Sequence, residues 1–319
     1  MSSEFEFLES IRRKFSLRKI GDDCAVLPKD GRTDMVVTAD MLVEDVDFRL
    51  EWTKPEFLGH KALAVSLSDI AAMGADPKWA MLSIAAPENI WKAGFIEAFY
   101  DGWHKLAKEF DVELIGGDIS RTPGKLVVDS TVGGEVEKGG AILRSNAKPG
   151  DAIFVTGQLG GAAAGLAMLE TGARYSDLAP VSESGLLLKQ LQPSPQVMIG
   201  KLLQKQHLAT AMIDISDGLS SDLGHICRES GVGAGIHAGK IPVFGVENQP
   251  NRPREDRLDM ALNGGEDFEL LFTAGKKNIS HLENAGFYLI GEITANVGII
   301  ELIDGASASV LTPKGFRHF

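Results

Sequence analysis

The sequence predicts an α/β fold divided into two domains. Apolar runs of strand length alternate with amphipathic stretches of helical period in both halves of the chain. The length of 319 residues suffices for about two domains of ordinary size. A glycine- and proline-containing break at 137–157 separates the halves. We therefore place one domain at residues 1–140 and the other at 141–319.

The first half is expected to contain three helices and four strands. The helices are predicted at 4–16, 55–74 and 89–110, where apolar residues recur every three or four positions. Pro55 and Gly74 suit the start and the end of the second helix. The strands are predicted at 35–40, 79–87, 112–118 and 125–136.

The second half continues the alternation. Strands are predicted at 152–157, 212–216, 234–238, 268–273, 287–293 and 298–303, and helices at 160–170, 195–206 and 218–230. Residues 245–257 are polar and contain prolines, which predicts an exposed loop.

Composition argues against several classes of protein. Apolar residues make up 44% of the chain, enough for a globular core, and the formal net charge is −12. An acidic protein does not suit non-specific binding to nucleic acid or to anionic membranes. Two cysteines are too few for a disulfide framework, and no apolar stretch approaches the roughly 20 residues of a membrane span. We expect a cytoplasmic protein with neither nucleic acid nor membrane as partner.

Aspartates recur in short glycine- and serine-rich turns beside apolar runs. They occur in GDDCAVL at 21–27, VVTAD at 36–40, SLSDIAAMGADP at 66–77, LIGGDIS at 114–120 and MIDISDGLSSDLGHI at 212–226. Carboxylates at strand ends, next to backbone amides, suit several Mg²⁺ ions around phosphates. For any one segment, an Asp that forms a turn or caps a helix is an equal alternative. Together the five segments favour a phosphate pocket.

The local pattern separates ligand candidates from their neighbours. Asp22 and Asp23 are adjacent and should point to opposite sides of an extended chain, so at most one is a direct ligand. Asp69 lies in a mostly apolar helix, where a carboxylate is costly to bury unless it is paired or holds a cation. Asp217 is a ligand candidate, but it or Ser216 could instead cap the following helix.

Other motifs are less specific. The chain has no GxxxxGK[ST] sequence, which excludes a Walker-type nucleotide loop. GQLGGAAAG at 157–165 lacks the dinucleotide spacing and is interpreted as close helix–strand packing. Gly117 would let backbone amides approach a phosphate, and Arg144 could clamp one, although a solvated arginine is the alternative. Glu266 is equally compatible with a substrate contact and with a plain turn.

Several of these segments occur in one order in a known family. GDDCAVL, KALAVSLSDIAAMGADP, LIGGD, RSNAKPGD, VTGQLGGAAAGLA, IDISDGLSSDLGHI, GGEDFELLFT and KGFRHF follow one another nearly from end to end. In this the chain resembles the thiamine-monophosphate kinases, within the superfamily that includes aminoimidazole ribonucleotide synthetase.

The resemblance implies a reaction and an architecture. ATP would phosphorylate thiamine monophosphate to thiamine diphosphate, the last step of its biosynthesis, by direct in-line transfer with several Mg²⁺ ions. The fold would be α/β (α+β) and resemble aminoimidazole ribonucleotide synthetase, with a C-terminal α/β domain. The N-terminal sheet would pair with that of a second copy into a barrel at a homodimer interface.

The resemblance also implies roles for individual residues, without a dedicated catalytic base. The metal ligands would be Asp23, Thr38, Ala39, Asp40, Asp69, Asp118, Asp214 and Asp217; ATP would contact Gly117, Asp118, Arg144 and Ser216; and the substrate would contact Asp47, Glu266 and Phe316. Two positions depart from the family pattern: Asp47 stands where a His is common, and Phe316 where a Tyr is common.

Two other hypotheses use the same acidic cleft. The first is another ATP-using member of the superfamily, of the cyclising synthetase type. The second is a non-catalytic protein that binds Mg²⁺ and nucleotide. An inactive homologue would be expected to have lost some of the six aspartates, whereas all six are present here.

Overall fold

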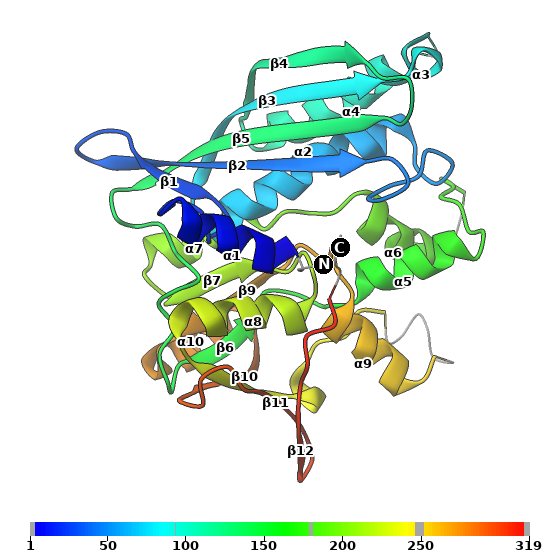
Figure 1. The fold of residues 1–319 in the computed structure, drawn as a ribbon. Coiled ribbons are helices and arrows are strands. Elements are labelled where there is room, and N and C mark those ends of the chain that lie inside the picture. Colours follow the sequence, from blue (N-terminus) through cyan, green and yellow to red (C-terminus); the bar gives the residue numbers. More distant parts are fainter. Residues whose placement is uncertain (1–3, 93, 179–180, 246–251, 316–319) are drawn as a thin grey trace.

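The computed structural model describes residues 4–92, 94–178, 181–245 and 252–315. Within these residues the chain forms a five-stranded and a seven-stranded sheet with helices packed between and around them (Figure 1). The strands of the first sheet end by Glu137, and those of the second begin at Ala152. The α/β class predicted from the sequence is confirmed.

The N-terminal sheet has the strand order β1 (Ala25–Pro28), β2 (Thr33–Val43), β5 (Val127–Glu137), β3 (Asp76–Ala86) and β4 (Glu113–Arg121). Neighbouring strands are antiparallel except β3 and β4, which are parallel. Inward-facing residues of β2, such as Val36, Thr38 and Leu42, are buried, whereas alternate residues point to the other face. The sheet therefore has one covered face and one open face.

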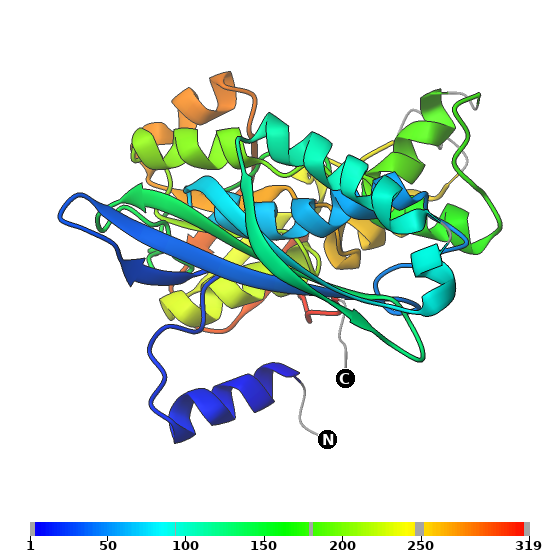
Figure 2. The same cartoon turned by 90° about the horizontal axis from the view of Figure 1, so that it is seen from above.

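Two helices cover one face of this sheet, and Figure 2 shows both on the side opposite to α1 (Glu4–Lys14). They are α2 (Pro55–Ala72) and α4 (Phe95–Glu109). Where they cross, a Cβ on Gly59 would lie 1.9 Å from the Phe99 carbonyl oxygen, and one on Gly102 equally close to that of Glu56. The two glycines let the helix backbones meet directly.

The C-terminal sheet has the order β12 (Ser307–Val310), β11 (Ile300–Asp304), β8 (Gly233–His237), β10 (Tyr288–Thr294), β6 (Ala152–Val155), β9 (Leu270–Ala274) and β7 (Ala211–Asp214). The helices of this half are α5 (Gly161–Glu170), α6 (Val181–Leu191), α7 (Val197–Lys205), α8 (Leu219–Ser230), α9 (Arg254–Asn263) and α10 (Ile279–Asn284). Short 3₁₀ turns occur at Ala238–Lys240 and Lys276–Asn278.

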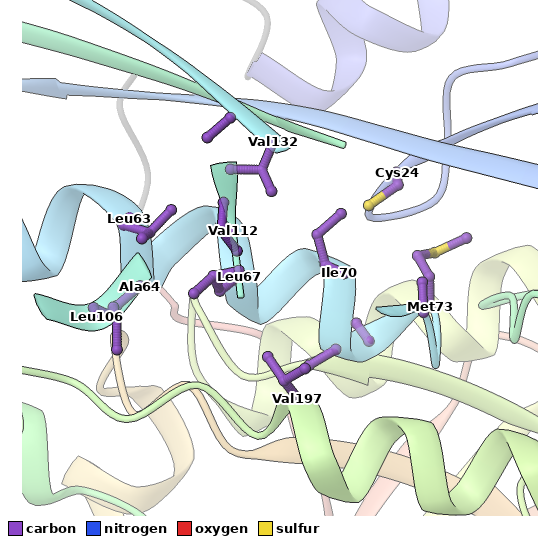
Figure 3. Packing of buried hydrophobic residues seen from close by; sticks show 14 of the residues in the cluster. Cys24, Leu63, Ala64, Leu67, Ile70, Met73, Leu106, Val112, Val132 and Val197 are labelled. Atoms are coloured by element: carbon purple, nitrogen blue, oxygen red, sulfur yellow. The ribbon is translucent and has the colours of Figure 1, made fainter. Parts of the chain in front are cut away.

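Helix α2 joins the two halves through one hydrophobic core. Figure 3 shows Ile70 of α2 and Met73, the residue after its end, between Val132 of the N-terminal sheet and Val197 of α7. The same cluster continues to Phe154 in the C-terminal sheet. Because α2 is apolar around its circumference and buried on both sides, it fixes the halves against each other.

Some predicted boundaries were wrong. The helix predicted at 89–110 is two helices, α3 (Glu88–Lys92) and α4, because Gly94 adopts φ +71° between them. Five elements were missed: β1, α6, α9, α10 and β12. The loop predicted at 245–257 gives way to α9 at Arg254, and residues 246–251 lie outside the described residues.

The open face of the N-terminal sheet carries large apolar side chains. All nine residues of the edge strand β4 are exposed, and on the open face Met41 of β2 is 58% and Met81 of β3 is 38% exposed. Large exposed apolar patches mark interaction sites, which makes this face a candidate for one. Within the described ranges, no helix is both long and apolar enough to cross a lipid bilayer.

Candidate active site

Four carboxylates from four separate segments converge at the junction of the two halves. Asp23 precedes β1, Asp40 lies on the inner side of β2, Asp69 on α2 and Asp214 at the end of β7. Carboxylate oxygens of Asp23, Asp69 and Asp214 all lie within 4.8 Å of one another. The structure thus unites four of the predicted metal ligands.

Hydroxyl groups hold three of these carboxylates. Thr38 Oγ1 donates to Asp69 Oδ2 at 2.5 Å, which places this predicted residue beside the cluster. Ser66 Oγ donates to Asp40 Oδ2 at 2.7 Å, and Ser68 Oγ to Asp214 Oδ2 at 2.6 Å. Both serines are fully buried and were not singled out from the sequence. The sequence offered one signal for them: they are two polar residues close to Asp69 in an otherwise apolar helix.

Burial and mutual repulsion oppose ionisation of the cluster. Burial, with repulsion from Asp23, raises the pKa of Asp214 to about 8. Burial likewise raises the pKa of Asp40 to about 6, and burial with repulsion from Asp40 and Asp214 raises that of Asp69 well above its usual value. A divalent cation would relieve both effects, so the donor set fits Mg²⁺, which prefers oxygen ligands.

Arg144 is the cation in contact with this cluster. Its Nη2 lies 2.5 Å from Asp23 Oδ1 and its Nε 3.4 Å from Asp23 Oδ2. Burial disfavours the guanidinium charge, but the nearby aspartates prevail and raise the pKa of Arg144. Asp22 accepts a hydrogen bond from the Arg144 backbone N–H at 2.8 Å. Asp23 thus reaches the cluster and Asp22 binds the Arg144 backbone; that at most one of them is a direct ligand stays a prediction.

A cavity of about 620 Å³ adjoins the cluster and reaches both halves of the chain. Its lining includes the predicted residues Asp40, Asp47, Ser216, Asp217 and Glu266. It also includes residues that sequence reasoning missed as site residues: Arg49, Trp52, Lys61 and Gln190. An indole ring, charged groups and a carboxylate cluster at one end suit a flat organic ligand with a phosphate tail.

The predicted substrate residues differ in how the structure places them. Asp47 lines the cavity, and its Oδ2 accepts a hydrogen bond from the Val43 backbone N–H at 2.7 Å. Glu266 lies 2.6 Å from the ammonium of Lys61. Phe316 lies outside the described residues, although Lys314 and Gly315 just before it line the cavity.

Asp217 belongs to a neighbouring group with Asp222 and His225, whose ligand atoms lie within 4.8 Å of one another. Asp222 accepts hydrogen bonds from the backbone N–H groups of Gly218 at 3.0 Å and Asp217 at 3.3 Å. Asp222 therefore satisfies backbone N–H groups at the start of α8, which is the role that the sequence left open for Asp217 or Ser216. Burial, with the charges of Arg144 and Arg228, lowers the pKa of His225 to about 3, so its imidazole is neutral.

Asp118, Gly117 and Ala39 are not part of the cluster in this chain. Asp118 is opposite Ser83 on the open face, and β5 and β3 separate its strand from β2. The exposed Ala39 also points to the open face. A Cβ on Gly117 would lie 1.9 Å from the Leu82 carbonyl oxygen, so glycine is required there by the approach of β3.

The glycine-rich segment 157–165 binds a carboxylate of the chain itself. Asp267 accepts hydrogen bonds from the backbone N–H groups of Gly160 at 2.6 Å and Ala162 at 3.0 Å, at the start of α5. These amides are engaged. The close packing predicted for this segment is present, but against helices and not against a strand: a Cβ on Gly165 would lie 2.2 Å from the Leu186 carbonyl oxygen of α6.

Comparison with known proteins decides the family. The family model for the N-terminal domain of AIR synthase related proteins matches residues 21–136, and that for the C-terminal domain matches residues 148–302. A thiamine-monophosphate kinase of Buchnera aphidicola is 41% identical over 95% of this chain and 93% of its own length. One of Bacillus subtilis is 39% identical over 94% and 93%, respectively.

The chain belongs to the thiamine-monophosphate kinase family. The resemblance drawn from its motifs is confirmed, and family membership makes the chain a kinase. The solved structure of "AaThiL complexed with AMPPCP and TMP" matches it with a TM-score of 0.86 and 32% identity, over 99% of this chain and 97% of that one. The fold of the thiamine-monophosphate kinase family therefore extends over both sheets.

Proposed function

We propose that this protein transfers the γ-phosphoryl group of ATP to thiamine monophosphate, giving thiamine diphosphate and ADP by direct in-line transfer. The observation that carries the proposal is the buried aspartate cluster opening, through Asp40, into a cavity of about 620 Å³. A relative of the same fold was solved in complex with AMPPCP and TMP.

The cluster is proposed to hold several Mg²⁺ ions. The ligands would be Asp23, Asp40, Asp69, Asp214 and Asp217, with Thr38 and the Ala39 carbonyl beside them. When bound, Mg²⁺ neutralises phosphate charge and lowers the barrier to phosphoryl transfer. The support is the fit of the donor set: closely spaced carboxylates whose pKa values are raised by burial and repulsion.

The remaining chemistry asks the protein for positioning. Arg144 and Ser216 would bind the phosphates of ATP, and Arg144 already lies 2.5 Å from Asp23. Asp47, Glu266 and Phe316 would bind the acceptor. A phosphate monoester has a second pKa near 6 and is largely ionised at neutral pH, so we assign no general base.

We also propose that the working form is a homodimer that shares its sites. Asp118 is too far along the sheet to join Asp40 of its own chain, since β5 and β3 lie between their strands. It lies on the open face opposite Ser83 of β3, a strand that also carries the exposed Met81 on this face. Packing two such faces into a barrel would carry Asp118 of each subunit toward the ATP site of the other.

The deciding experiment is ADP release from ATP and Mg²⁺ with and without thiamine monophosphate, followed by identification of the product. We expect ADP release that depends on the acceptor and yields thiamine diphosphate. ADP release without acceptor dependence would reject the proposal and favour another phosphate acceptor of the superfamily.

A further inference from the structure

Glu266 is held in a costly backbone conformation. Its φ is +67° and that of Phe268 is +50°, a region that non-glycine residues adopt at a cost of about 1 kcal/mol or more. The loop keeps this shape because Glu266 N–H donates to the Ser216 carbonyl at 2.8 Å and Phe268 N–H to that of Ile215 at 2.9 Å. The strain points the Glu266 side chain into the cavity beside the segment that carries Asp214.

Two side chains from other elements then fix the Glu266 carboxylate. Lys61 on α2 is 4% exposed, and its Nζ lies 2.6 Å from Glu266 Oε1. Gln190 on α6, 6% exposed, donates through Nε2 to Glu266 Oε2. The Lys61 ammonium also donates to the Gln190 carbonyl at 3.4 Å. All three residues line the cavity.

This network is a poor device for stability. Removing a lysine from water costs free energy that a single ion pair barely recovers, and a pair of apolar side chains in place of both partners is often as stable. The surroundings on α2 are apolar, with Leu58 and Leu63 almost fully buried. A strained backbone and a buried ammonium thus converge on one carboxylate in the cavity lining.

The carboxylate keeps hydrogen-bonding capacity toward the cavity. Each carboxylate oxygen can accept two hydrogen bonds, so Lys61 and Gln190 leave one lone pair on each oxygen. The Lys61 charge balances that of Glu266. The pair therefore presents a fixed hydrogen-bond acceptor to the cavity and carries little net charge. The aminopyrimidine end of thiamine carries an exocyclic amino group, which is a donor that such an acceptor recognises.

We propose that Lys61 and Gln190 are positioning residues that hold Glu266 so that it selects the amino group of the substrate's pyrimidine ring. This inference rests on the proposed function and on the Glu266 contact with the acceptor. A site that hydrogen-bonds a substrate N–H rejects an analogue that lacks it more strongly than an apolar pocket does.

Lys61→Met tests the proposal through binding of thiamine monophosphate, measured by calorimetry with Mg²⁺ and AMPPCP present. We expect its Kd to rise about tenfold, with a smaller rise for Gln190→Leu and partial recovery in Lys61→Arg. The KM for ATP should change less than about twofold. The melting temperature should fall in Lys61→Met, because the Glu266 carboxylate loses its buried partner, so binding is compared at a temperature at which both proteins are folded. Lys201→Met is the matched control, since Lys201 pairs with Asp76 at 2.5 Å and is not in the cavity lining.

A second probe is the phosphate monoester of the analogue whose pyrimidine bears oxygen in place of the amino group. The wild-type protein should prefer thiamine monophosphate, and Lys61→Met should lose most of that preference. An unchanged preference would overturn the positioning role of Lys61. So would an equal loss of affinity for ATP and for thiamine monophosphate. If the wild-type protein binds thiamine monophosphate but does not phosphorylate it, the proposed function fails while this binding comparison still decides the role of Lys61.

Discussion

At the scale of single residues, the clearest feature is a set of aspartates kept together against their own repulsion. Asp69 is one turn along α2 from Ser66, and both lie in a helix whose other buried residues are almost all apolar. Burial in the first place, and repulsion between neighbouring aspartates in the second, raise the pKa values of Asp40, Asp69 and Asp214. Carboxylates are gathered in this way where a cation is to be bound.

Asp214→Asn should remove most phosphoryl transfer without loss of the fold. Loss of one charged ligand is expected to lower kcat by about a hundredfold or more. The melting temperature should stay the same or rise, because one buried, repelled carboxylate is gone. Steady-state kinetics measures kcat, and thermal unfolding measures the melting temperature. Asp304→Asn is the control, because Asp304 lies in an exposed ion pair with Arg254. Wild-type turnover in Asp214→Asn would reject the metal assignment.

At the scale of elements, close backbone approaches decide where the site residues stand. Gly59 and Gly102 let α2 and α4 meet, which seats α2 against the sheet and brings Asp69 to Thr38. Asp267 fixes the start of α5 by accepting two backbone N–H groups. Each contact is local, but each sets the position of a whole helix.

Gly59→Ala should destabilise the protein although alanine favours helices. The added Cβ would lie 1.9 Å from the Phe99 carbonyl oxygen, and separating the helices should cost about 1–3 kcal/mol. Gly185→Ala on α6 is the matched control, since a Cβ there meets no atom within 4 Å, and it should stabilise by about 0.5–1 kcal/mol. Denaturant unfolding compares the two, and equal effects would contradict the close crossing.

Asp267 should make stability depend on pH. Burial raises its pKa to about 6 from an ordinary 3.8, so between these values the folded protein keeps a proton that the unfolded chain releases. Its contribution is therefore fully present below about pH 4 and is lost as pH rises through 6. Relative to Asp267→Asn, the wild-type free energy of unfolding should fall by about 3 kcal/mol between pH 4 and 7.5. A difference that is constant with pH would show that Asp267 does not titrate in this range.

At the scale of the whole molecule, the two faces of the N-terminal sheet carry different parts of the proposed site. The inner face presents Asp40 and Thr38 to α2, and the open face presents Asp118 among exposed apolar residues. One chain cannot bring both faces to the same ligand. In the proposed homodimer, a second copy packed on the open face would supply its own Asp118.

Complementation between inactive subunits tests this arrangement. Asp118→Asn and Asp214→Asn homodimers should each be nearly inactive. A heterodimer purified through two different tags contains one site with both aspartates intact and should recover about half of wild-type activity. Heterodimers as inactive as the parents would show that Asp118 serves its own subunit.

The sequence alone determined the class of fold, most of the strands, and which acidic residues are candidates for the site. These follow from local patterns: apolar alternation in β2, the apolar run of α2, and aspartates at the ends of such runs. The break between α3 and α4 was missed because Gly94 interrupts an otherwise continuous helical spacing. Short elements such as β1 and β12 have too few residues to show a period.

Only the tertiary structure decided which residues share a site. The cluster joins Asp23 to Asp214 across nearly two hundred positions because β7 and β2 both pack on α2. The link from Lys61 to Glu266, and the separation of Asp118 from Asp40, likewise depend on strand order and helix placement. Local chemistry gives each residue its capacity to bind, whereas long-range packing sets the distances that turn that capacity into a site.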